Sequence, residues 1–270
     1  SLVAACDIPA GTEITASMIR IQSPGQGLQP NRLPELLGRR LPVDKARGDV
    51  FFPSDLKTPA ASPRRYQFEQ PFGLPVRYHD IKTFSQSSNL DLVEIHLSYK
   101  DLDVDLEQVL PEPQDIGLVI HAPELFAGDH TLDLCTADQS YRTHSVAELQ
   151  RVIDISRDLR ERFRCSEPVL LVTNVGGFSE HRHLDRAERV PLRERLIESL
   201  KRLNTQGEVE IIPQTMPPFP WHFGGQRFHN LFVDSEFIAD FCKEQKMRVC
   251  LDASHSKLAC NHLHSPFREF

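Results

Sequence analysis

The chain lacks the features that would place it in a membrane or a secretory pathway. No apolar run approaches the roughly 18 residues that a membrane-spanning helix needs. The first residues also lack the basic-then-apolar order of a signal peptide. The six cysteines include no Cys-x-x-Cys pair, and Cys135, Cys242 and Cys250 stand among apolar neighbours. We therefore expect buried, reduced thiols in a cytoplasmic protein rather than disulfides or a redox centre.

An excess of positive charge is missing as well. The formal net charge is −7 at pH 7, and residues 1–56 are balanced, with six Lys or Arg and six Asp or Glu. The negative excess therefore lies in the remainder of the chain. This balance disfavours nucleic acid as a partner, because a polyanion binds to a basic surface. Hydrophobic residues make up 40% and charged residues 26% of the chain, which argues against disorder.

Two regions of different character are visible along the chain. Residues 1–56 contain frequent turns, including Asp7–Gly11 and Ser23–Gly27, and only short apolar stretches. This pattern predicts a small β-rich domain. Residues 57–73 are rich in Pro, Ala, Ser and charge and predict an extended linker. From residue 74 to residue 270, apolar runs alternate with segments of helical periodicity.

This alternation predicts a parallel sheet covered by helices, as in an α/β TIM-barrel-type domain. The predicted strands are Pro75–His79, Leu92–Leu97, Gly117–His121, Pro168–Asn174, Val209–Gln214 and Met247–Asp252. The predicted helices are Ser145–Phe163, Pro191–Leu203 and Ser235–Gln245. Only six of the eight strands of a complete barrel can be counted, so we expect a barrel that is truncated at its C-terminal side.

Polar residues follow several of the predicted strands. His121 ends one strand, while Asp252 and His255 stand at the end of another in Asp-x-x-His spacing. Because the carboxyl ends of parallel strands meet at one face of a barrel, these three side chains are candidate ligands for a divalent metal such as Mn, Zn or Co. The alternative is structural: Asp252 caps the next helix and His255 packs in its first turn.

Other strand-end and loop residues are candidates for catalysis or substrate binding. Glu94 and His96 alternate on one strand and face the same side, where they form either a proton relay or a structural contact. Asn174 and Gln214 are placed either to orient substrate hydroxyls or to satisfy the backbone. Trp221 and Arg227 lie on a long loop after the predicted strand 209–214, which predicts a pocket wall or an ordinary packed loop.

The first region resembles the SAF (antifreeze-like, β-clip) domain that closes sialic acid synthases. The resemblance depends on Asp7–Gly11, Pro24–Leu28, Leu36–Arg39 and Phe51–Leu56. In that family the domain follows a condensing barrel that joins phosphoenolpyruvate to an N-acyl hexosamine, and it reaches over the neighbouring subunit's site. The resemblance therefore implies a homodimer. A basic residue often precedes the Pro-Gly turn; here Ser23 stands there, and Arg20 is the nearest candidate sugar contact.

The second region resembles the xylose-isomerase-like TIM barrels, which include sugar epimerases and apurinic endonucleases. His121, Asp252 and His255 match metal ligands of the endonuclease-type pattern. Two positions depart from that pattern: Asn174 stands where it has a histidine, and Gln214 where it has a glutamate. An amide oxygen is a weaker ligand for Zn²⁺ or Mn²⁺ than imidazole or carboxylate.

A closer resemblance is to bacterial surface-polysaccharide synthases in which a condensing barrel, a SAF domain and an isomerase-like barrel are fused in that order. It depends on Met216–Trp221, Gly224–Arg227 and Leu251–Asn261. The resemblance implies a fragment, truncated at both ends, of a bifunctional sialic-acid-type (nonulosonate) synthase with a metal-dependent sugar isomerase or epimerase barrel. The alternatives are a catalytically inactive sugar-binding or scaffolding barrel, and an apurinic-endonuclease-like DNA repair enzyme.

Overall fold

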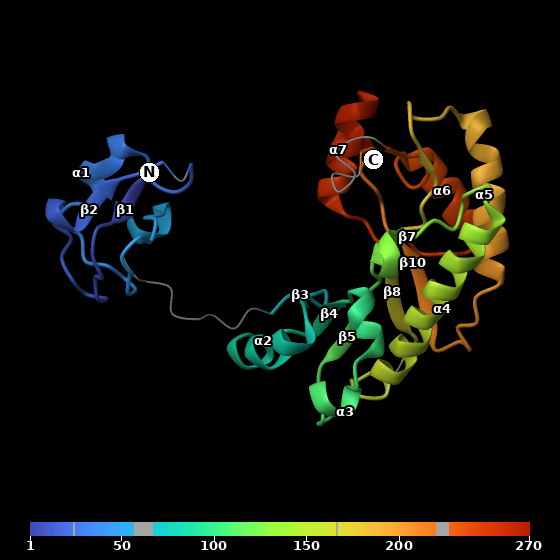
Figure 1. The fold of residues 1–270 in the computed structure, drawn as a ribbon, viewed down its shortest axis with the longest axis horizontal. Helices are drawn as coiled ribbons and strands as arrows, with labels where there is room; N and C mark the ends of the chain where they lie inside the picture. Colours follow the sequence, from blue (N-terminus) through green and yellow to red (C-terminus); the bar gives the residue numbers. More distant parts are fainter. Residues whose placement is uncertain (24, 57–66, 166, 220–226) are drawn as a thin grey trace. The chain divides into compact units, whose positions relative to one another are not determined.

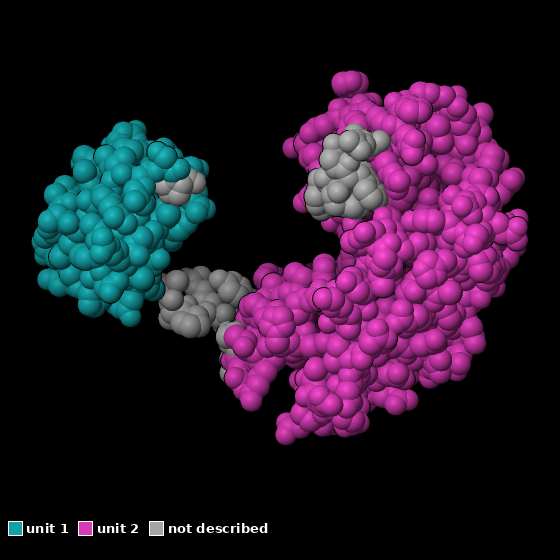
Figure 2. Space-filling model, in the orientation of Figure 1, with its two compact units in different colours: residues 1–66 teal, residues 67–270 magenta. Residues whose placement is uncertain are grey.

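The computed structural model describes residues 1–23, 25–56, 67–165, 167–219 and 227–270. The chain divides into two compact units, residues 1–66 and 67–270 (Figure 2). The predicted linker 57–73 therefore falls partly outside the described residues, and its last residues belong to the second unit. The second unit's first strand begins at Gly73.

The first unit is held together by a small apolar core between short elements. The strands β1 (Leu2–Ala4) and β2 (Ile19–Ile21) pair antiparallel, and α1 spans Leu33–Leu36. The core consists of the buried residues Leu2, Ala4, Ile8, Ile14, Leu28, Leu36, Leu41 and Phe51. Beside this core, Lys45 Nζ lies 3.0 Å from the buried Asp55 carboxylate. Three short 3-10 helices, Ala16–Met18, Pro30–Arg32 and Pro53–Leu56, complete the regular structure described in this unit.

A five-stranded parallel sheet forms the centre of the second unit. Its strands are β3 (Gly73–Val76), β4 (Leu92–His96), β5 (Gly117–His121), β8 (Val169–Thr173) and β10 (Val209–Pro213). Their spatial order is β10-β8-β5-β4-β3, so successive strands of the sheet lie side by side. This is the strand order of a TIM-barrel-type domain, and the described residues form five parallel strands that do not close into a barrel.

Helices and short hairpins connect these strands. The helices are α2 (Ile81–Ser87), α3 (Leu106–Val109), α4 (Gln139–Arg160), α5 (Arg186–Lys201), α6 (Ser235–Gln245) and α7 (Ala253–Leu263). The short antiparallel pairs are β6 (Leu125–Phe126) with β7 (His130–Thr131), and β9 (Phe178–Ser179) with β11 (Phe228–His229). The helix α4 packs on β8, and α5 lies beside α4 (Figure 1).

The sixth predicted strand, Met247–Asp252, is reduced to a single parallel bridge between Cys250 and Gln214. Two backbone hydrogen bonds make this contact: Cys250 N donates to Pro213 O at 2.8 Å, and Thr215 N donates to Cys250 O at 2.9 Å. The bridge still places the end of this segment beside the end of β10. The relative position of Asp252 is therefore that of a strand-end residue, although no regular strand precedes it.

The two faces of the sheet differ in burial. On β4, Val93 and Ile95 are buried, while Glu94 and His96 are half-buried and point to the other side. The same alternation on β5 leaves His121 half-buried beside the buried Ile120. This period of two is that of a barrel wall whose apolar side lies under helices. None of the helices among the described residues is long and apolar enough to cross a membrane.

Candidate functional site

The carboxyl ends of β4 and β5 bring a carboxylate and two imidazoles together. His96 and His121 are register partners, and their rings stack with centroids 4.4 Å apart at an interplanar angle of 17°. Glu94 Oε1 lies 2.7 Å from His96 Nε2. This hydrogen bond is the main cause of a lowered pKa of Glu94, against the opposing effect of partial burial. The predicted pair Glu94 and His96 is therefore in direct contact, with Glu94 held as a carboxylate.

A hydrogen-bonded chain joins His121 to two further strand-end residues. The Nε2 atom of His121 donates to Gln214 Oε1 at 3.0 Å when it carries the proton, and Gln214 Nε2 donates to Asp252 Oδ2 at 3.1 Å. The other ring nitrogen of His121, Nδ1, lies 2.9 Å from Ala122 O. We call His121, Gln214 and Asp252 the amide bridge, because the Gln214 side chain connects the other two.

Asp252 and His255 are also part of the start of α7. Asp252 Oδ1 accepts a hydrogen bond from the backbone nitrogen of His255 at 2.9 Å, which is an N-cap contact. The His255 ring lies beside Asp252, with its Nδ1 2.9 Å from Thr215 O and 3.5 Å from Asp252 Oδ2. The contacts are those of the structural alternative in the sequence analysis: Asp252 caps the helix, and His255 is buried in its first turn.

Asn174 contributes a polar atom that has no partner. It follows β8 as Gln214 follows β10, and the register pairs Thr173 with Pro213 directly before them. The Asn174 side chain is buried, and within the described part of the chain its Oδ1 has no hydrogen-bond partner. Leaving a buried acceptor unpaired costs about 1–3 kcal/mol. A ligand donor at this position would recover that energy.

The Asp133 carboxylate accepts backbone hydrogen bonds that hold the turn after Asn174. The buried Asp133 Oδ1 accepts from Gly177 N at 3.0 Å and from Cys135 N at 2.9 Å, although burial raises its pKa. Gly176 has a φ of +78°, and a Cβ there would lie 2.4 Å from Asp133 Oδ1. Only glycine fits this turn, so Asp133 and Gly176 together determine how the chain leaves β8 at Asn174.

Thr215 and Asp133 are site residues that sequence reasoning missed. Thr215 Oγ1 accepts from Asp252 N at 2.9 Å, and the Thr215 carbonyl contacts the His255 ring. Its position directly after Gln214, a predicted substrate-binding residue, was the available signal. Asp133 lies in a loop far along the chain from β8, and no local sequence signal placed it beside Gly177.

The remaining predicted residues lie elsewhere. Arg227 lines a cavity of about 250 Å³ with Tyr141, Phe178 and others, and its guanidinium lies 5.9 Å from the Phe178 ring centroid. Trp221 lies outside the described residues. Arg20 belongs to the first unit, on β2, where its Nε is buried and has no hydrogen-bond partner within the described part of the chain. The structure therefore gathers Glu94, His96, His121, Gln214 and Asp252, and places Asn174 on the strand next to Gln214.

The predicted metal ligands do not fit a metal ion in this arrangement. Among the described residues, no three His, Cys, Asp or Glu side chains gather around a common metal position. Both ring nitrogens of His121 face oxygen atoms, and both Asp252 oxygens accept hydrogen bonds. Cys250, close to Asp252 along the chain, has its pKa raised to about 11 by burial and by the neighbouring Glu94 and Asp252.

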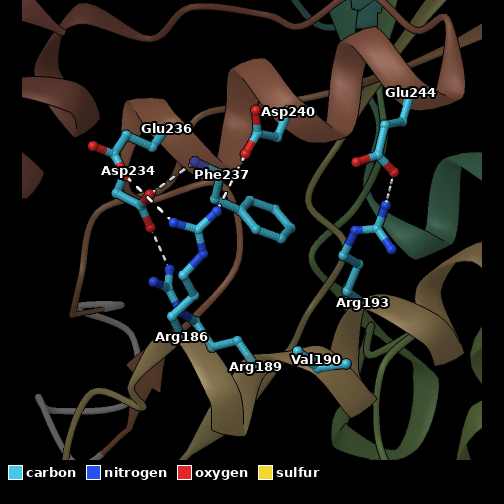
Figure 3. Close-up of a pocket in the computed structure, with 9 residues that line it drawn as sticks. All are labelled: Arg186, Arg189, Val190, Arg193, Asp234, Glu236, Phe237, Asp240 and Glu244. Carbon is cyan, nitrogen blue, oxygen red and sulfur yellow. Dashed lines mark hydrogen bonds and ion pairs between the residues drawn. The ribbon is translucent and has the colours of Figure 1, made fainter.

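A second pocket lies between α5 and α6 and is of a different kind (Figure 3). Arginines from α5 meet acidic side chains from α6 across it, and each is paired. Arg189 contacts Asp234, Arg193 contacts Glu244, and Arg186 lies 3.5 Å from Asp240. We call these pairs the α5–α6 ladder. Its mutually neutralised charges indicate a structural role rather than a ligand site.

Comparisons with known proteins agree with this architecture. The SAF domain family matches residues 1–57, and the xylose isomerase-like TIM barrel family matches residues 84–263. A solved structure described as a D-tagatose 3-epimerase-like protein shares 17% identity at a TM-score of 0.50, covering 74% of this chain and 70% of its own. A solved L-ribulose 3-epimerase shares 14% identity at a TM-score of 0.46, covering 70% of this chain and 62% of its own.

At such identities the structural likeness shows the fold alone. No curated protein matches the chain significantly. The second family covers 180 of the 270 residues, counted from 84 to 263. Its span contains all the residues that we call the strand-end cluster: Glu94, His96, His121, Asn174, Gln214 and Asp252. The chain therefore belongs to the xylose isomerase-like TIM barrel family, with a SAF domain preceding the barrel-type domain.

Proposed function

We propose that the barrel-type domain binds a small, uncharged sugar at the carboxyl ends of its parallel strands, without a metal ion. The observation that carries this proposal is the buried Asn174 Oδ1, which has no donor within the described part of the chain. A sugar hydroxyl is a donor of the required kind. The neighbouring Gln214, Glu94 and Asp252 add amide and carboxylate groups that bind hydroxyls in the same way.

The accessibility of the cluster supports this proposal. The side chains of Glu94 and His96 are 32% and 42% exposed, and that of Asp252 is 28% exposed. A ligand can therefore reach these groups, while their mutual hydrogen bonds hold them in place. Preformed groups lose little side-chain entropy on binding. The cluster contains two carboxylates and no arginine or lysine, which disfavours a phosphorylated or acidic sugar.

Binding is tested by titrating the purified chain with D-xylose, D-tagatose, N-acetylglucosamine and N-acetylmannosamine, followed by saturation-transfer NMR. We expect Asn174→Ala to weaken binding of the best sugar by about 5–10-fold, because one hydrogen bond contributes about 1 kcal/mol. Asn31→Ala, at an exposed position of the first unit, is the matched control. Absence of binding for all four sugars, or unchanged affinity in Asn174→Ala, would contradict the proposal.

Proton transfer on the bound sugar is a second candidate function, and the 2.7 Å contact between Glu94 and His96 favours it. A carboxylate beside an imidazole can move a proton from one carbon to another, as an isomerase or epimerase requires. The lowered pKa of Glu94 makes it a weaker base, which is why we place binding first. Incubation with each sugar in D₂O decides the matter: C–H exchange that Glu94→Gln abolishes would establish catalysis.

The first unit would act in a larger assembly. Its SAF domain, and its resemblance to the closing domain of sialic acid synthases, support a role beside a nonulosonate synthase site in a cytoplasmic homodimer. Arg20 would then contact an anionic group of that substrate, because its buried Nε has no partner within the described part of the chain. The DNA-repair alternative finds no support in the comparisons or in the acidic strand-end cluster.

A further inference from the structure

We infer that the Gln214 side chain takes the place of a metal ion in this domain: its amide connects His121 to Asp252 by hydrogen bonds, and this connection keeps the strand ends aligned without a cation. The inference rests on the proposed site at the strand ends and deepens it. It is carried by two contacts, His121 Nε2 to Gln214 Oε1 at 3.0 Å and Gln214 Nε2 to Asp252 Oδ2 at 3.1 Å.

The distances distinguish this arrangement from a metal site. A zinc ion bonds nitrogen and oxygen ligands at about 2.0–2.2 Å, so two ligands of one ion lie within about 4.4 Å of each other. Here an entire amide group lies between His121 and Asp252, with a hydrogen bond on each side. An ion could bind these two atoms only after the Gln214 side chain had left its place between them.

The polarity of the amide explains why it suits this position. Its oxygen accepts from an imidazole N–H, and its NH₂ group donates to a carboxylate, so each end meets a complementary partner. A glutamate at position 214 would instead place a second carboxylate next to Asp252. Two carboxylates at hydrogen-bond distance repel each other strongly, and either a shared proton or a bound cation relieves the repulsion.

The amide bridge also links the end of β10 to the start of α7. Asp252 caps α7 through Oδ1 while Oδ2 accepts from Gln214, so one carboxylate joins β10 to α7. Thr215 Oγ1 adds a second link by accepting from Asp252 N. A hydrogen-bonded link of this kind is directional, and it needs no ion from solution. The strand ends are therefore aligned in the chain as it folds.

The test is Gln214→Glu, with metal content measured by isothermal titration and by mass spectrometry after Zn²⁺ or Mn²⁺ is added and excess is removed. We expect no stoichiometric metal in the wild type, and one ion per chain in Gln214→Glu that is lost again in Gln214→Glu/Asp252→Asn. Gln139→Glu, at an exposed position on α4, adds the same charge away from the cluster and should gain no metal.

Two results would overturn the inference: a stoichiometric ion in the wild type that Asp252→Asn removes, or a folded Gln214→Glu that takes up none. If Gln214→Glu does not fold, NMR of ¹⁵N-histidine-labelled wild type still decides, with His121 assigned through His121→Asn. We expect a protonated Nε2 whose signal is unchanged by Zn²⁺; a metal-induced shift would refute the inference. These readouts do not involve sugar, so failure of sugar binding would leave this result standing.

Discussion

The strand-end cluster and the α5–α6 ladder both join separate elements through polar side chains, yet they do so in opposite ways. In the ladder, each arginine meets an acidic partner, and the pairs Arg189–Asp234 and Arg193–Glu244 neutralise each other across the gap. At the strand ends, an amide connects an imidazole to a carboxylate, and Asn174 Oδ1 has no donor among the residues that the structure describes. In the ladder the charges are neutralised, although Arg189 Nε also has no hydrogen-bond partner within the described residues. At the strand ends the unpaired atom is an acceptor, which a ligand hydroxyl could satisfy.

The most damaging single change should fall in the ladder rather than in the cluster. Asp234 caps α6 by accepting from Phe237 N at 2.9 Å, and it pairs with Arg189, whose side chain is only 14% exposed. Asp234→Ala removes the cap and leaves a largely buried guanidinium without its carboxylate. We expect a loss of about 2–3 kcal/mol in the free energy of unfolding, measured by urea denaturation.

Asp240→Ala on the same helix is the control for that prediction. Asp240 and its partner Arg186 are 64% and 79% exposed, so their ion pair contributes at most about 0.5 kcal/mol. Equal losses from the two substitutions would show that burial of the pair does not determine its contribution. Neither substitution should alter sugar affinity; a change in affinity would break the distinction between the two regions.

Asn174→Leu should raise the free energy of unfolding, whereas Asp234→Ala should lower it. It replaces a buried acceptor that lacks a partner by an apolar side chain of similar size, so we expect the free energy of unfolding to rise by about 1 kcal/mol. The gain should come with loss of sugar binding. Denaturation and sugar titration on the same samples test both effects.

Asn230→Leu provides the matched comparison. Asn230 is also buried, but its amide donates to Gly177 O and Ser179 Oγ at 2.9 Å each, and its Oδ1 accepts from Leu184 N at 2.7 Å. The same substitution there should destabilise the fold by about 2–3 kcal/mol, since it leaves these groups unpaired. If both substitutions destabilised equally, the unpaired state of Asn174 would not be the relevant difference.

The smallest expected effect concerns pH. The hydrogen bond from His96 lowers the pKa of Glu94 below its ordinary value of 4.5 in the folded chain. A lowered folded-state pKa stabilises the fold above the unfolded value, and this contribution is lost as the pH falls through the folded value. As the pH falls below about 4.5, Glu94→Gln should therefore lose less free energy of unfolding than the wild type, as followed by circular dichroism.

Exposed Glu107→Gln on α3 serves as its control, because its carboxylate pairs with Arg162 at the surface while its side chain is 75% exposed. We expect a smaller change in the acid profile for this variant than for Glu94→Gln. An identical profile for wild type and Glu94→Gln would show that the half-buried contact with His96 contributes no more than a solvated carboxylate.

Strand periodicity and turn chemistry determined the general architecture from sequence alone. The alternation of Val93, Glu94, Ile95 and His96 predicted which side chains share a face, because successive residues of a strand point to opposite sides. The apolar runs likewise predicted all five strands of the parallel sheet within a few residues. The segment 247–252 was the exception: its apolar character predicted a strand, but only Cys250 pairs with β10.

What each polar strand end does was decided only by the tertiary structure. The sequence offered Asp252 and His255 equally as metal ligands or as a helix cap with a packed ring, since Asp-x-x-His spacing suits both. The choice depends on where Gln214 and Thr215 place their hydrogen-bonding groups, and those lie about 40 residues away along the chain. Local pattern determines which face a side chain occupies; its partners come from long-range packing, which no local pattern encodes.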